Sequence, residues 1–179
     1  MTKYIAFLKA INVGGHTIKM DYLKKLFEKM SFSNIETFIA SGNVVFEIKS
    51  KSVDPIRKKI EVELEKSLGY NVATFLRTVN KLKEISEYKP FKDSELKDKN
   101  NSLYIAFLNS PPLKESIKKT KALQDKFNAF HFNKNEMYWL CRKSFSDSGI
   151  TGKKLEKALG TNTTIRNSTT VKKIAAKFG

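Results

Sequence analysis

The spacing of hydrophobic residues changes from segment to segment in the first half of the chain. Residues 4–10 form an apolar run typical of a strand, and apolar residues over 23–30 recur every three or four positions, as on one face of a helix. Residues 35–39 and 44–48 are rich in β-forming residues and flank a turn that contains glycine and asparagine. This pattern predicts a strand, a helix and a β-hairpin.

The pattern continues with a helix, a strand and a second helix. Asp54 and Pro55 are typical of a helix start, apolar residues recur every four positions after them, and Gly69 is typical of a helix end. Residues 72–77 are typical of a strand, and Thr78 is the expected N-cap of a trailing helix. The first half therefore predicts the order βαββαβ followed by a helix.

The second half of the chain repeats this order. Residues 4–8 and 104–108 are identical, and residues 64–69 match 155–160 at five of six positions. Two matched segments in the same order indicate an internal duplication. The elements expected in the second copy are a strand at 102–108, a helix at 113–124, a hairpin of 127–132 with 137–141, a helix at 153–159, a strand at 163–166 and a helix at 171–178 capped by Ser168 or Thr169.

The order βαββαβ is that of the ferredoxin-like fold, or α-β plait, in which two helices cover one face of a four-stranded antiparallel sheet. We therefore expect an α+β protein of two ferredoxin-like units that pack together, over residues 1–88 and 101–179. The charged residues 89–100 are the expected connector between them. A length of 179 residues suits this arrangement and excludes a large multidomain enzyme.

The charge of the chain indicates acidic partners. There are 34 Lys and Arg against 18 Asp and Glu, a formal net charge of +16, which attracts nucleic acid or another polyanion. One cysteine and two histidines favour neither a disulfide nor a zinc site, and the N-terminal apolar run is too short for a signal peptide or a membrane span. We expect a cytoplasmic protein with no membrane association, no metal and no cofactor.

Basic residues are densest near the C-terminus, where residues 134–179 contain ten Lys and Arg against three acids. A capped helix start in this region adds the partial positive charge of its backbone amides. Tyr138 and Trp139 are nearby, either as stacking partners for bases or as core residues. The predicted anion or nucleic-acid ligands are Arg142, Lys143, Lys153, Lys154, Arg166, Asn167, Thr169, Lys172 and Lys173.

Arg77 and Arg166 occupy matching positions at the end of the last strand in each copy. The chain contains 30 Lys and only four Arg, so arginine at both places indicates a need for the planar guanidinium. Two roles are open. One is a buried contact between the copies, with a carboxylate or with strand carbonyls, and the other is the binding of an anion.

Three short stretches lie at turns or at a helix start: Ile11-Asn12-Val13-Gly14-Gly15, Ser41-Gly42-Asn43-Val44-Val45-Phe46 and Arg166-Asn167-Ser168-Thr169-Thr170-Val171. They resemble the signature stretches of a bacterial family catalogued as domain of unknown function 1697. The resemblance spans the whole chain and implies the duplicated ferredoxin-like fold. It implies no established activity, cofactor or catalytic residue.

An enzyme or binder acting on a phosphorylated or carboxylate metabolite is the alternative interpretation, because turns after strands often carry functional polar groups. The candidate residues of that small-ligand site are Asn12, Gly14, Gly15, His16, Lys19, Ser41, Asn43 and Arg77. The chain has no nucleotide-binding glycine motif and no recognisable triad spacing. We therefore favour a binding protein for nucleic acid over an enzyme, with a non-catalytic scaffold or homodimer as the third interpretation.

Overall fold

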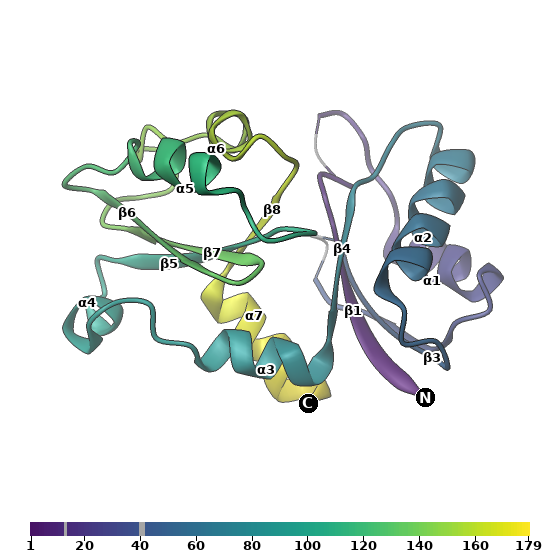
Figure 1. Cartoon of the computed structure of the whole chain (residues 1–179). Coiled ribbons are helices and arrows are strands. Elements are labelled where there is room, and N and C mark those ends of the chain that lie inside the picture. Colours follow the sequence, from purple (N-terminus) through teal and green to yellow (C-terminus); the bar gives the residue numbers. More distant parts are fainter. Residues whose placement is uncertain (13, 40–41) are drawn as a thin grey trace. The chain divides into compact units, whose positions relative to one another are not determined.

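The computed structural model describes residues 1–12, 14–39 and 42–179. The chain divides into two compact units, Met1–Leu82 and Lys83–Gly179, each with a four-stranded antiparallel sheet and helices (Figure 1). The division lies within helix α3 (Val79–Glu87), earlier than the connector that the sequence indicated at residues 89–100. Those residues belong to the second unit and contain the short helix α4 (Asp93–Lys97), which the hydrophobic pattern did not predict.

The first unit follows the predicted order of elements. These are β1 (Thr2–Leu8), α1 (Met20–Lys29), β2 (Ser33–Thr37), β3 (Asn43–Ile48), α2 (Val53–Leu68), β4 (Thr74–Thr78) and the start of α3. The strands lie in the order β2-β3-β1-β4. Strand β1 is interior in the sheet, and its Tyr4, Ala6 and Leu8 are buried in a core with apolar residues of α1 and α2. This placement explains the apolar run near the N-terminus.

The second unit repeats that order of elements. These are β5 (Ser102–Phe107), α5 (Lys114–Lys121), β6 (Asn128–Asn133), β7 (Glu136–Cys141), α6 (Gly152–Leu159), β8 (Thr164–Asn167) and α7 (Ser168–Phe178). Its strands lie in the matching order β6-β7-β5-β8. The register also matches, because Ile5 pairs with Arg77 in the first sheet and Ile105 pairs with Arg166 in the second. The identical segments at 4–8 and 104–108 therefore contribute equivalent strands.

Several predicted helix ends are confirmed. Gly69 and Gly160 end α2 and α6 in the left-handed conformation, where the absence of a side chain removes the steric cost. At the start of α3, the amide of Lys81 donates a hydrogen bond of 3.2 Å to Oγ1 of Thr78. Thr78 therefore acts as the N-cap that the sequence predicted.

Two predicted N-caps are wrong by one or two residues. Helix α2 begins after Ser52, so that Asp54 lies in its first turn, where its charge favours the helix start. Helix α7 begins directly after β8, and its N-cap is Asn167, because Ser168 is already helical. The Oδ1 of Asn167 accepts a hydrogen bond of 2.8 Å from the amide of Thr169.

Gly42, in the connection from β2 to β3, lies where the fold leaves no room for a side chain. Its φ is +73°, and a Cβ would lie 2.6 Å from Cγ2 of Ile11 and 3.1 Å from Cβ of Leu8. We expect Gly42→Ala to lower the free energy of unfolding by about 2–4 kcal/mol through backbone strain and overpacking. Urea denaturation measures this loss.

The matched control is Gly15→Ala. Gly15 also has a positive φ, of +87°, but no described atom lies within 4 Å of its would-be Cβ. The loss there should be about 1 kcal/mol, from backbone strain alone. Equal losses at Gly15 and Gly42 would contradict the close packing at Gly42.

Candidate functional site

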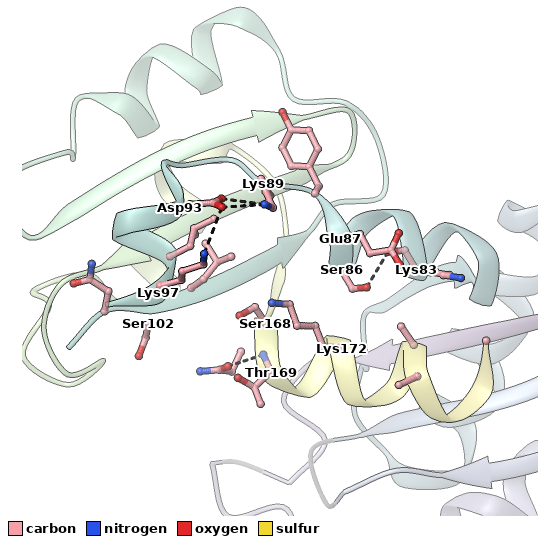
Figure 2. Close-up of a pocket in the computed structure, with 18 residues that line it drawn as sticks. Lys83, Ser86, Glu87, Lys89, Asp93, Lys97, Ser102, Ser168, Thr169 and Lys172 are labelled. Atoms are coloured by element: carbon pink, nitrogen blue, oxygen red, sulfur yellow. Dashed lines mark hydrogen bonds and ion pairs between the residues drawn. The ribbon is translucent and has the colours of Figure 1, made fainter. Parts of the chain in front are cut away.

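A cavity of about 980 Å³ lies in the second unit (Figure 2). Helices α3, α4 and α7 and the start of β5 contribute its lining, together with the segment between α3 and α4. Most of the lining is polar or charged. The polar and charged side chains belong to Lys83, Ser86, Glu87, Tyr88, Lys89, Asp93, Lys97, Asn101, Ser102, Asn167, Ser168, Thr169 and Lys172.

The pairing of β5 with β8 brings two parts of this lining together. Tyr104 pairs with Asn167, the last residue of β8, and α7 follows without a loop. The first residues of β5, Ser102 and Leu103, therefore lie near the first turn of α7. The residues of these segments that line the cavity are Ser102, Leu103, Asn167, Ser168 and Thr169.

The charge within the cavity is mainly positive, with four lysines against two acids. Asp93 is engaged by two of the lysines, because its oxygens lie 3.0 Å from Nζ of Lys89 and 3.8 Å from Nζ of Lys97. The hydrogen bond and charge of Lys89 hold the pKa of the Asp93 carboxyl below its ordinary value. Within the described parts of the chain, no acidic side chain pairs with Lys83 or Lys172.

The first turn of α7 adds to the positive potential. It contains no acidic residue, whereas the first turns of α1 and α2 contain Asp21 and Asp54. Lys172 is in the second turn of the helix, and Figure 2 shows its side chain extending toward Ser168. Since a helix start carries roughly half a positive charge, this turn favours an anion.

Three of the nine predicted anion ligands line the cavity, namely Asn167, Thr169 and Lys172. Four others are exposed but lie outside its lining: Lys143, Lys153, Lys154 and Lys173. Among these, Lys143 has its Nζ 3.7 Å from the ring centroid of Phe127. The remaining two, Arg142 and Arg166, have partners within the protein.

Arg142 forms an ion pair with α4. Its Nη2 donates to Oε1 of Glu95 at 2.5 Å, and this hydrogen bond lowers the pKa of the Glu95 carboxyl. The backbone oxygen of Glu95 also accepts a hydrogen bond of 3.0 Å from Nδ2 of Asn101. These two contacts link α4, one wall of the cavity, to the end of β7 and the start of β5.

Arg77 and Arg166 are buried, each with 9% of its surface exposed. Nη1 of Arg77 donates to the carbonyl of Leu76 at 2.8 Å, and Nη1 of Arg166 donates to the carbonyl of Ile165 at 3.0 Å and to Oγ1 of Thr164 at 2.8 Å. Burial lowers the pKa of Arg166 to about 10, which leaves it charged at neutral pH. These carbonyls belong to the strand of each arginine itself, so they are a different contact from the one between the copies that the sequence left open.

Tyr138 and Trp139 are core residues, which confirms one of the two roles expected for them. Neither side chain is exposed. The hydroxyl of Tyr138 donates to the carbonyl of Ile85 at 3.2 Å, and the Trp139 indole packs near the Tyr104 ring at a centroid distance of 5.2 Å. Neither ring is accessible to a base.

Three lining lysines, Lys83, Lys89 and Lys97, were absent from the sequence-based site. The hydrophobic pattern assigned Lys83 to the first unit and treated the other two as parts of a connector. The signal that could have found them was the density of charge in residues 89–100. A charged segment with few apolar residues is equally typical of a connector between the copies.

The alternative small-ligand residues are only partly brought together. Gly15, His16 and Lys19 line a hollow of about 480 Å³ in the first unit, where the His16 ring stacks on Tyr70 at a centroid distance of 3.8 Å. The predicted residues outside that lining are Asn12, Gly14, Asn43 and Arg77. Ser41 lies outside the described residues.

Two of those outlying residues stabilise the turns in which they lie. Oδ1 of Asn12 accepts a hydrogen bond of 2.7 Å from the amide of Ile18, and Nδ2 of the buried Asn43 donates to the carbonyl of Phe38 at 2.9 Å. These contacts support a structural role for both asparagines.

In the described ranges 1–12, 14–39 and 42–179, no group of three or more His, Cys, Asp or Glu residues is arranged to hold a metal ion. No helix there has both the length and the apolar character needed to cross a bilayer. Cys141, the single cysteine, is buried.

Comparison with known families gives a match over most of the chain. The sequence profile described as protein of unknown function (DUF1697) matches residues 1–138. The chain belongs to this family. The matched range of this DUF1697 protein ends before residues 166–171, the third stretch on which the resemblance was based. No curated protein matches the chain.

Among solved structures, the DUF1697 chain is similar to the conserved bacterial protein SP0830 from Streptococcus pneumoniae. The TM-score is 0.79 and the sequences are 21% identical, with 99% of this chain and 98% of that chain covered. At this identity the similarity concerns the fold. It supports a mixed α+β architecture with two four-stranded antiparallel sheets.

The surroundings of His131, which include Tyr88, predict how the free energy of unfolding depends on pH. The Tyr88 hydroxyl lies 2.8 Å from Nε2 of His131, and burial, with a smaller effect from the Lys121 charge, lowers the pKa of His131. His131 therefore binds a proton more readily in the unfolded chain than in the folded protein. As a result, the free energy of unfolding decreases as pH falls below about 6.5. Urea denaturation at several pH values should show that His131→Phe removes the part of the pH dependence of the free energy of unfolding that His131 causes.

Below the lowered pKa of His131, both states carry the proton, so the contribution of this group should level off. A His131→Phe variant whose stability falls with acidification as steeply as that of the wild type would contradict the assignment. The variant keeps an aromatic ring at the position and removes the titrating group.

Proposed function

We propose that this chain is a cytoplasmic anion-binding protein whose ligand is nucleic acid, bound at the cavity of the second unit. One observation carries the proposal: four lysines line a cavity whose lining also includes Ser168 and Thr169, in the first turn of α7. Lysine side chains and helix starts are two common means of holding phosphate groups. The net charge of +16 would attract a polyanion toward the protein from a distance.

The chemistry of the lining favours binding over catalysis. Its described residues include neither histidine nor cysteine, the side chains most often used for proton transfer at neutral pH or as strong nucleophiles. Asp93 is engaged by Lys89 and Lys97. Besides the carboxylate of Glu87, hydroxyl, amide and ammonium groups remain, and these three suit the recognition of phosphate oxygens.

Within this proposal the other predicted basic residues have different roles. The exposed lysines outside the cavity, Lys143, Lys153, Lys154 and Lys173, contribute long-range attraction. Arg142 holds α4 in place through Glu95, and Arg166 stabilises the end of β8. The arginines thus position the site, and the lysines that line it bind the ligand.

We also propose that each unit is a ferredoxin-like α-β plait and that the two arose by internal duplication. The repeated order βαββαβ, the matching strand orders and the equivalent positions of the identical segments at 4–8 and 104–108 support this origin. The matching hydrogen bonds of Arg77 and Arg166 to the carbonyls of the preceding residues support it further.

A second candidate function is the binding of a small phosphorylated or carboxylate metabolite at the hollow of the first unit. The observation that favours it is the convergence of Gly15, His16 and Lys19 with the ring of Tyr70. This hollow has about half the volume of the cavity in the second unit, 480 Å³ against 980 Å³.

The nucleic-acid proposal is tested by two substitutions on one helix. Lys172→Ala and Lys173→Ala remove the same charge from neighbouring exposed positions of α7, but only Lys172 lines the cavity. In salt titrations with labelled single-stranded DNA and RNA, we expect Lys172→Ala to weaken binding and to reduce the log-log salt slope by about 0.7, one phosphate contact on a single strand. Lys173→Ala should leave the slope close to that of the wild type.

Two results would contradict this proposal. Equal effects of Lys172→Ala and Lys173→Ala would mean diffuse attraction to a basic surface. An absence of binding by the wild type at about 0.15 M salt would exclude nucleic acid as the physiological ligand.

A further inference from the structure

We infer that the cavity of the second unit receives an unpaired nucleotide and that the ring of Tyr88 is the surface on which its base stacks. This inference rests on the proposed function, since it assumes that the lysines of the cavity bind phosphates. It adds the form of the ligand, single-stranded nucleic acid, and a residue that distinguishes bases from phosphates alone.

The first step is the position of the ring. Tyr88 directly follows α3, and its amide continues the helical pattern with a hydrogen bond of 3.1 Å to the carbonyl of Glu84. Tyr88 is half-buried and is one of the residues that line the cavity. Among the described residues of the lining, Tyr88 is the aromatic one.

The second step is the rigidity of the ring. At one end, the hydroxyl of Tyr88 lies within hydrogen-bond distance of His131, at 2.8 Å from Nε2. The ring also packs near the fully buried Tyr138 at a centroid distance of 5.1 Å. A ring held by such contacts loses little further freedom when a ligand binds, so that stacking on it has a small entropic cost.

The third step is that this ring shares the cavity with lysines that have no acidic partner among the described residues. Proteins that bind single strands use basic groups for the backbone and aromatic rings for successive bases. Here Lys83 and Lys172 lack acidic partners among the described residues and share one cavity with Tyr88. Bases within a duplex are stacked on their neighbours, so only an unpaired base can present its face to the ring.

The size of the cavity agrees with this ligand. A volume of about 980 Å³ lies at the upper end of the range for sites that enclose small ligands. Such a space accommodates a nucleotide or a short part of a strand, and a duplex is too wide to enter it. The base and its phosphate can therefore reach Tyr88 and Lys172 only from a single strand.

The test compares a thymidine 12-mer with an abasic 12-mer that has the same number of phosphates. Fluorescence anisotropy at fixed salt should show that the wild type binds the thymidine strand between about 5-fold and about 150-fold more tightly, the range for one stacked base. Tyr88→Leu should bind both strands at the abasic level. Tyr88→Phe, which loses the hydroxyl contact with His131 but keeps the ring, should retain the preference for the thymidine strand.

Phe91→Leu is the matched control. Phe91 is a half-buried aromatic residue three positions away, with its ring centroid 6.3 Å from that of His131, and it does not line the cavity. This variant should bind both strands as the wild type does. Thermal denaturation of all three variants shows whether each retains the fold.

The outcomes separate this inference from the proposed function. Equal affinity of the wild type for both strands, with binding still weakened by Lys172→Ala, would overturn the stacking inference and leave the phosphate site intact. A preference for thymidine that persists in folded Tyr88→Leu would overturn the role of Tyr88. Absence of binding to either strand would overturn both proposals.

Discussion

The register between β5 and β8 determines where the functional groups of the second unit meet. Because Tyr104 pairs with Asn167 and α7 begins at the next residue, the start of a helix lies beside the first residues of β5. A shift of one residue would turn Thr164 and Arg166, which lie on the same face of β8, to the other face of the sheet. The first unit uses the same arrangement, in which β4 leads directly into α3.

The two kinds of cation in this chain have different physical tasks. A buried guanidinium is costly unless its donors are satisfied, and Arg77 and Arg166 donate to the carbonyls of the residues before them. These fixed, planar contacts stabilise strand ends. Lys83 and Lys172 are exposed, flexible and without acidic partners among the described residues, which suits them to a mobile polyanion.

The fold could be predicted from the sequence because its signals are local. The spacing of apolar residues and the glycines at 69 and 160 depend on neighbouring residues alone. The repeat of residues 4–8 at 104–108 then shows that the second half follows the same order. The site was only partly predictable. Asn167, Thr169 and Lys172 were found near a helix start, but Tyr88, Lys83 and Lys89 join them only through tertiary packing that a charged, apolar-poor segment does not reveal. The short helix α4 was missed for the same reason.

Backbone amide NMR during titration with a single-stranded oligonucleotide tests the central claim most directly, because it reports on every part of the chain at once. Saturable shifts should concentrate at the first turn of α7, Ser168 and Thr169, and at residues 86–89, in the lining of the cavity. The hollow at residues 15–19 in the first unit should be unaffected. Shifts centred on 15–19, or small shifts spread over all exposed lysines, would contradict a specific anion site at α7.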